Sequence, residues 1–194
     1  MDIDVTKFLF WGIIAVAIFY LVSVYNGLVS LKHAVSKAWA NIDVLLKQRH
    51  DELPKLVETC KQYMEYEQET LEKVMQARTS VASAQQSGDM AALGKAEGAM
   101  RLGLGSLFAV AEAYPDLKAN KTFQHLQIRI TGLENDIADR REFYNESVNN
   151  NNVRIEQFPD VVLIALFFNF KSFELLEFAD EEKTDVDIGQ LFEK

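Results

Sequence analysis

The sequence predicts an all-α protein in which an N-terminal transmembrane helix is followed by a long antiparallel four-helix bundle. Only 3 prolines and 9 glycines interrupt the 194 residues, which favours long helices over many short strands. One stretch near the N-terminus is uncharged and apolar, and the chain after it carries apolar residues at the three- and four-residue spacing of packed helices. The hydrophobic share of 48% is enough for a core and argues against a disordered chain.

Residues 8–25 form the predicted transmembrane helix, because these 18 residues contain no charged side chain. At about 1.5 Å per residue the stretch is roughly 27 Å long, close to the thickness of the hydrocarbon layer. Trp11 near one end, and Tyr20 and Tyr25 toward the other, suit the membrane interface. A cleaved signal peptide is the main alternative, but residues 1–7 are acidic rather than basic. We therefore expect an uncleaved anchor with the lipid bilayer as its partner.

The lysines and arginines that flank this segment predict its orientation. Lys7 is alone before it, whereas Lys32, Lys37, Lys47 and Arg49 follow it. The positive-inside rule then places the N-terminus outside and the bundle in the cytoplasm.

Joints between the four helices are predicted from breaker and capping residues. Pro54 is expected to end the first soluble helix and to begin a second one that runs to about residue 86. The turn at 87–89 offers Asp89 as the N-cap of a third helix, residues 90–113, whose small residues favour close helix packing. A joint at 114–116 precedes a fourth helix of nearly 40 residues, which Pro159 ends. Four long helices with short joints predict an antiparallel bundle.

The C-terminal part combines an apolar run with an excess of acidic residues. The ten residues 161–170 are too few to span a bilayer as a helix, so the run could dock on the bundle, lie in a membrane interface or join another subunit. The predicted segments are a short N-terminal segment (1–7), the transmembrane helix (8–25), the helical bundle (26–159), an apolar, phenylalanine-rich segment (160–178) and an acidic tail (179–194).

Residue patterns typical of catalysis and ligand binding are missing from the sequence. The net charge of −9 disfavours nucleic acid as a partner, since a phosphate backbone requires a basic surface. The three histidines lack the spacing of metalloprotease and di-iron motifs, and no P-loop or dinucleotide fingerprint is present. Cys60 lies among apolar positions and is expected to be a buried, inert thiol. The asparagines at 149–152 are expected to be an exposed helical stretch. We expect no enzyme activity, catalytic residue, cofactor or metal site.

Several strings resemble the LemA family of bacterial membrane proteins. They are YNGLV (25–29), the polar stretch from Ala38 to Val57, AEAYPDLKAN (111–120), RREFYN (140–145) and RIEQFP (154–159). The resemblance covers roughly residues 25–159 and the preceding anchor. It implies a single-pass anchor in the bacterial cytoplasmic membrane and a helical bundle facing the cytoplasm, and it brings no established catalytic residues.

Ten residues are candidates for a structural or interaction role: Trp39, Asp43, Arg49, Asp51, Tyr114, Asp116, Asn120, Phe167, Phe168 and Phe170. In the simplest interpretation Asp43 and Arg49 satisfy buried partners, and Asp116 or Asn120 caps the long helix.

Two functions remain open from the sequence. The first is a non-enzymatic, membrane-anchored scaffold that forms a homo-oligomer, because apolar runs without an active site usually mark interfaces. The second is a regulatory or adaptor module that uses its acidic tail to dock on another membrane protein. Because LemA family members are often encoded near a membrane-embedded zinc metalloprotease, an envelope quality-control protease is one such partner.

Overall fold

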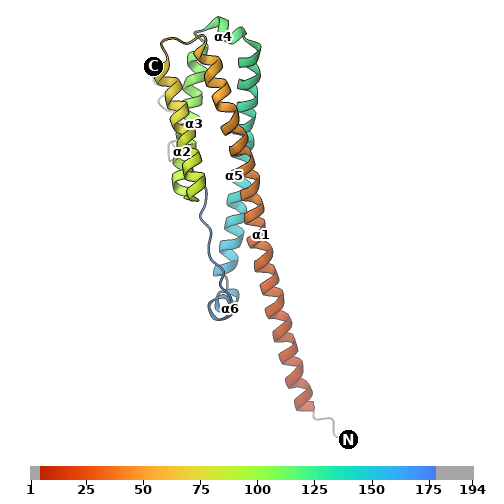
Figure 1. The fold of residues 1–194 in the computed structure, drawn as a ribbon. Helices are drawn as coiled ribbons and strands as arrows, with labels where there is room; N and C mark the ends of the chain where they lie inside the picture. Colours follow the sequence, from red (N-terminus) through yellow and green to blue (C-terminus); the bar gives the residue numbers. More distant parts are fainter. Residues whose placement is uncertain (1–4, 178–194) are drawn as a thin grey trace, which may run out of the picture. The chain divides into compact units, whose positions relative to one another are not determined.

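The computed structural model describes residues 5–177 of the chain, and its regular elements there are helices. They are α1 (Val5–Lys61), α2 (Gln68–Ser87), α3 (Met90–Ala111), α4 (Pro115–Ala119), α5 (Lys121–Glu156) and α6 (Asp160–Phe167) (Figure 1). No strand occurs among these described residues, so the all-α prediction is confirmed. The acidic tail predicted for residues 179–194 lies outside the described part.

The chain divides into two compact units. Among the described residues, the first contains 5–41 together with 142–175, and the second contains 42–141 together with 176 and 177. α1 and α5 each contribute one part to each unit. The region predicted as a single bundle, residues 26–159, is therefore divided between two units, and each is described by itself below.

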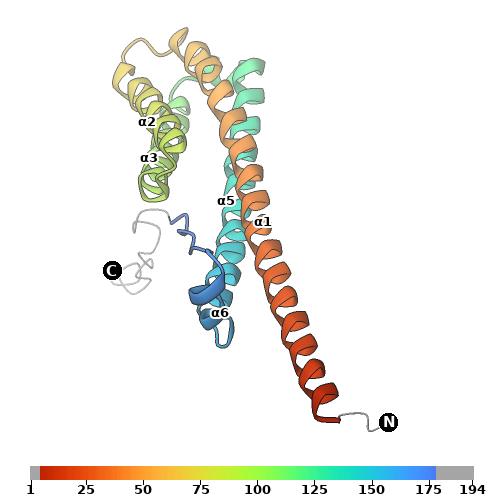
Figure 2. The same cartoon turned by 60° about the horizontal axis from the view of Figure 1, so that its bottom comes forward.

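The second unit is an antiparallel four-helix bundle made by the later part of α1, by α2 and α3, and by the first part of α5. Its core is formed by buried apolar side chains from all four helices, among them Leu46, Leu56, Val74, Met100, Leu107 and Ile130. α2 and α3 lie side by side in both views (Figure 1, Figure 2). A Cβ atom added at Gly103 of α3 would lie 3.5 Å from a methyl carbon of Val74 in α2, which is an ordinary van der Waals contact, so α3 and α2 pack against each other at this position.

The joints on either side of α3 follow the predicted signals. Gly88 has a φ of 71° and ends α2, because its backbone N–H donates to the carbonyls of residues 84 and 85. The Asp89 side chain accepts a hydrogen bond of 2.8 Å from the backbone N–H of Ala92, which confirms Asp89 as the N-cap of α3. Pro115 lies at the first position of the short α4, where a proline needs no backbone donor.

The predicted helix break at Pro54 is wrong, because α1 continues through Pro54 to Lys61. A proline inside a helix cannot donate to the carbonyl four residues earlier, here that of His50. The side chain of Arg78 in α2 supplies the missing donor, since its Nε atom lies 3.0 Å from the His50 oxygen. The actual break, residues 62–67, contains no glycine or proline that could have marked it.

The first unit contains the N-terminal part of α1, the last part of α5, α6 and the segment up to residue 175. Ile164 of α6 packs against Val24 and Leu28 of α1, with Leu163 and Phe168 beside them. Part of the apolar run thus packs on α1, where the predicted membrane segment meets the predicted bundle.

The asparagine run at 149–152 is not uniformly exposed, contrary to the sequence expectation. Asn151 is buried, and its Oδ1 atom has no hydrogen-bond partner among the described residues. Asn152 uses both amide atoms on Phe173, donating to its carbonyl at 2.8 Å and accepting from its N–H at 3.0 Å. The run therefore fastens the segment after α6 to α5.

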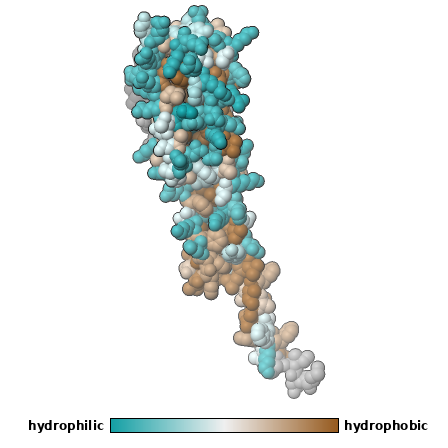
Figure 3. Space-filling model, viewed as in Figure 1, coloured by the Kyte–Doolittle hydropathy of each residue, from teal (hydrophilic) through white to brown (hydrophobic). Residues whose placement is uncertain are grey.

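The N-terminal part of α1 is long and apolar enough to cross a membrane. Only 6% of its most apolar 18-residue window is buried, unlike the core helix of a soluble protein. Phe8 and Phe19, for example, each expose 77% of their surface. Hydrophobic residues cover this part of α1 in the space-filling view (Figure 3). So much exposed apolar surface on a single helix is stable only in an apolar environment such as a bilayer.

Candidate interaction site

Three of the candidate residues on α1 fasten this helix to different neighbours. The ring of Trp39 lies 5.8 Å from that of Tyr144 in α5, measured between centroids. The Oδ1 atom of Asp43 accepts a hydrogen bond of 2.6 Å from the side-chain amide of Gln85 in α2. Arg49 is fully buried and is paired within the second unit. Asp43 and Arg49 thus have the internal partners that the sequence predicted.

Arg49 forms the centre of a buried ion network. Its guanidinium grips the carboxylate of Glu97 in α3 with two hydrogen bonds, of 2.9 and 2.5 Å, and donates to Glu134 in α5 at 2.5 Å. Arg49 and Glu97 expose only 1% and 3% of their side chains, whereas Glu134 exposes 21%. The bidentate contact joins α1 to α3, and the single bond to Glu134 joins α1 to α5 at the same point of the core.

Burial and neighbouring charges shift the pKa values of Arg49 and Glu97 in opposite directions. Burial lowers the pKa of Arg49, but Glu97 and Glu134 outweigh it and raise the pKa above its ordinary value. Burial raises the pKa of the Glu97 carboxyl, and the positive charges of Arg49 and Arg141 oppose that rise. Arg49 therefore stays cationic, and its charge is used within the bundle rather than on a ligand.

The candidates near the joint before α5 serve local structure. The Oδ1 atom of Asn120 accepts from the backbone N–H groups of residues 122 and 123, so Asn120 caps α5. Its side-chain nitrogen also donates to the hydroxyl of Tyr63 at 3.0 Å. Asp116 is exposed in the first turn of α4, and Tyr114 is half-buried before it. Asp51 is exposed on α1.

The three candidate phenylalanines differ in exposure. Phe168 and Phe170 are partly buried, and their rings lie 5.3 and 6.0 Å from the ring of Tyr25 in α1. Phe167 exposes 67% of its surface.

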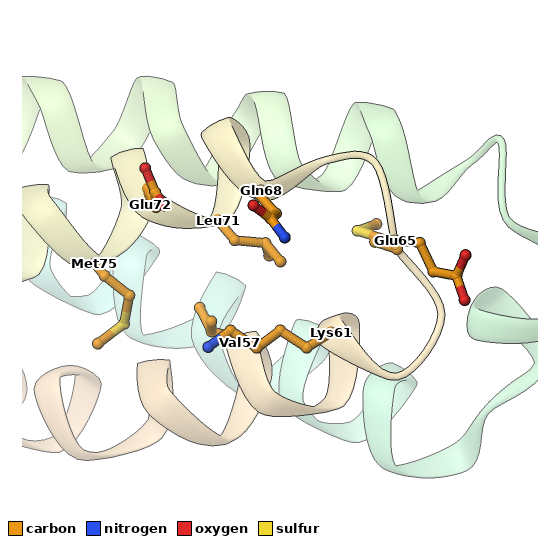
Figure 4. Close-up of a pocket in the computed structure, with 8 residues that line it drawn as sticks. Val57, Lys61, Glu65, Gln68, Leu71, Glu72 and Met75 are labelled. Carbon is orange, nitrogen blue, oxygen red and sulfur yellow. The ribbon is translucent and has the colours of Figure 1, made fainter.

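A groove of about 760 Å³ lies between the end of α1 and the start of α2, within the second unit. Its apolar lining comes from Val57, Met64, Leu71 and Met75, and its polar lining from Lys61, Glu65, Gln68 and Glu72. Leu71 and Met75 point from α2 toward α1, and Val57 points from α1 toward α2 (Figure 4). The lining of the groove therefore combines apolar side chains with charged side chains of both signs.

Metal-ligating and nucleophilic side chains were expected to have no catalytic arrangement, and the structure describes the surroundings of several of them. Within residues 5–177, no group of three or more histidine, cysteine, aspartate or glutamate side chains could hold a metal ion. Cys60 is completely buried, and burial raises the pKa of its thiol to about 12, so the reactive thiolate is scarce at neutral pH. His50 is partly buried, which lowers its pKa, and Arg78 lowers it further.

Sequence reasoning missed two parts of this arrangement. Glu97 could have been found, because it lies on the buried face of α3 between Leu93 and Met100 at helical spacing and so needs a positive partner. The groove had no comparable signal, since it arises where the chain leaves α1 at residues 62–67 without a glycine or proline.

Comparison with known proteins gives a family match and several relatives. The LemA family model matches residues 38–189. Magnetosome proteins MamQ 1 and MamQ 2 of Paramagnetospirillum magneticum are each 34% identical to the chain over 107 residues, which is 55% of this chain and 39% of the relative. Protein LemA of Metamycoplasma hominis is 26% identical over 186 residues, which is 95% of this chain and 84% of the relative. The match therefore spans well under half the length of the MamQ relatives.

Proposed function

Because the chain belongs to the LemA family and carries an exposed apolar helix, we propose that it is a non-enzymatic scaffold that self-associates at the bacterial cytoplasmic membrane. In this proposal residues 8–25 cross the membrane once, with the N-terminus outside and the bundle in the cytoplasm. The exposed lysines 32, 37 and 47 after the apolar stretch support that orientation.

The use of the polar core residues supports a non-enzymatic role. Arg49 and Glu97 are buried in the second unit and form an ion pair with each other. Asp43 and Asn120 are likewise engaged in bonds within the fold. The names of the reported relatives describe no catalytic activity.

The groove between α1 and α2 is the observation that carries self-association. Two copies related by a two-fold axis present the same patch to each other, so the patch must be complementary to itself. The groove meets this condition because Lys61 lines it together with Glu65 and Glu72, and apolar side chains line it as well. A shared membrane plane also raises the effective concentration of the copies, which offsets the repulsion expected from a net charge of −9.

Self-association through the groove is tested with Met75→Asp and a matched control. Met75 is half-buried in the groove, whereas its neighbour Gln76 is exposed and does not line it, so Gln76→Asp makes the same charge change outside the site. We expect crosslinking of wild-type protein in membranes to give products at multiples of 22.1 kDa, which Met75→Asp reduces at least several-fold and Gln76→Asp does not. Equal crosslinking of all three proteins would contradict the proposal.

A regulatory or adaptor role is the second candidate, because Met64 and Met75 both line the groove. Methionine side chains are flexible and suit surfaces that accept differently shaped partners. In that case the crosslinked products would lie at masses that are not multiples of the chain's own, and Met75→Asp would remove those products instead.

A further inference from the structure

The segment around α6 has more exposed apolar surface than its packing on α1 explains. Ile164 faces α1, but Leu166 and Phe167 expose 68% and 67% of their surfaces, and Phe158 before the helix exposes 83%. Val161 and Val162 expose 40% and 45%. No charged residue occurs between Asp160 and Lys171. A helix that is apolar on all sides needs a second apolar neighbour.

The contacts of α6 and its flanking residues on α1 fix its depth relative to the predicted membrane segment. They involve Tyr20, Val24, Tyr25 and Leu28, a stretch of about 12 Å along the helix axis. The predicted membrane segment, residues 8–25, ends at Tyr25 and is followed by the polar Asn26, so the contact at Tyr20 lies about 7.5 Å inside that segment. This agrees with the depth of about 5–10 Å at which interfacial helices enter a bilayer.

Asp160 carries the one charge in α6 and lies at the end of α6 that contacts Tyr20, inside the predicted membrane segment. Asp160 is buried and pairs with Arg154 of α5, and its Oδ1 atom lies 3.5 Å from the hydroxyl of Tyr20. These contacts hold the start of α6 against the end of α5 and against α1. Further along, Phe168 and Phe170 pack on Tyr25, and a hollow beside them is also lined by Lys32 and His33. Aromatic rings followed by basic residues are typical of the boundary between lipid and water.

We infer that residues 158–168 form a second membrane contact, in which α6 lies in the lipid interface beside the anchor and inserts Phe158, Leu166 and Phe167 among the acyl chains. The space-filling view agrees, because the hydrophobic surface of the α6 region continues onto the adjoining part of α1 (Figure 3). The inference rests on the proposed membrane span of residues 8–25. A second membrane contact beside that single-pass anchor would restrain the tilt of α1 in the bilayer.

The test uses spin labels on cysteines introduced one at a time into the full chain, which is reconstituted in vesicles of phosphatidylethanolamine and phosphatidylglycerol. The labelled variants are Leu166→Cys and Phe167→Cys, with Val16→Cys as the marker for the membrane span. Ile128→Cys is the matched control, because Ile128 exposes 74% of its surface and belongs to the second unit. Unmodified protein, whose native Cys60 is buried, gives the labelling blank.

Collision with oxygen, which concentrates in lipid, is compared with collision with a water-soluble nickel chelate. We expect the oxygen-to-nickel ratio at 166 and 167 to exceed that at 128 at least fivefold and to approach the ratio at 16. A ratio equal to that at 128 would overturn the inference and place α6 in water. Protection from both reagents would also overturn it, in favour of contact with a second copy. A water-like ratio at 16 would instead contradict the anchor itself.

Discussion

The sequence indicated that Arg49 has buried partners, but it did not indicate which residues these are. The sequence placed an arginine close to an apolar seam, so an internal partner was expected. Only the packing of α3 and α5 against α1 shows that Glu97 and Glu134 are those partners. The relative rotation of helices decides which side chains meet, and no local pattern encodes it.

Removing the guanidinium should therefore be costly. Arg49→Met leaves Glu97 buried without its partner, and we expect the free energy of unfolding to fall by about 3–5 kcal/mol. The variant Glu134→Gln should lose less, because Glu134 is partly exposed and Glu97 keeps both of its bonds. Urea unfolding followed by circular dichroism measures both.

A double variant shows whether Arg49→Met is destabilising because Glu97 is left charged and unpaired or because the side chain at position 49 is smaller. Arg49→Met with Glu97→Leu removes both charges, and we expect it to recover most of the stability that Arg49→Met loses. If Arg49→Met were as stable as Glu134→Gln, the buried network would not hold the helices in register.

Cys60 gives a prediction that depends on burial alone. Its thiol is fully buried, and the pKa of about 12 leaves only about one molecule in ten thousand as thiolate at pH 8. We expect the native protein to resist Ellman's reagent at pH 8 for hours and the urea-unfolded protein to react within minutes. Rapid reaction of the native protein would show that α1 opens near Cys60.

α1 is the element for which local propensity misled the sequence analysis. Pro54 is an ordinary helix breaker, but Arg78 supplies the donor that the proline lacks, so α1 continues to Lys61. Tertiary contacts thus override a strong local signal. The turn at Gly88 and the cap at Asp89 were predictable, because their residues act within a few positions along the chain.

A double-mutant cycle tests this compensation. Arg78→Gln leaves the His50 carbonyl without its donor, and we expect a loss of about 1–3 kcal/mol in the wild-type background. In the Pro54→Ala background the N–H of residue 54 can reach the same carbonyl, so Arg78→Gln should cost at least 1 kcal/mol less. Equal costs in the two backgrounds would mean that Arg78 acts independently of the proline.

For the whole molecule, the fold class and the membrane helix were predictable, because both depend on composition and on the spacing of apolar residues along the chain. The division into two units was not, since α1 and α5 run through both without a change in sequence pattern. The C-terminal segment also has more structure than its composition indicates. The hydroxyl of Tyr144 donates to the carbonyl of Glu174, and Leu176 is buried. A truncation that tests the acidic tail should therefore remove residues 179–194 and leave the preceding segment in place.

We propose above all that the anchored protein is a defined assembly of identical chains. The most direct measurement is the mass of the full-length protein in mild detergent by light scattering, with the detergent contribution subtracted, at several concentrations. We predict a discrete multiple of 22.1 kDa that persists at micromolar concentration, and we expect Met75→Asp, but not Gln76→Asp, to lower it. A mass of one chain at every concentration would contradict the account.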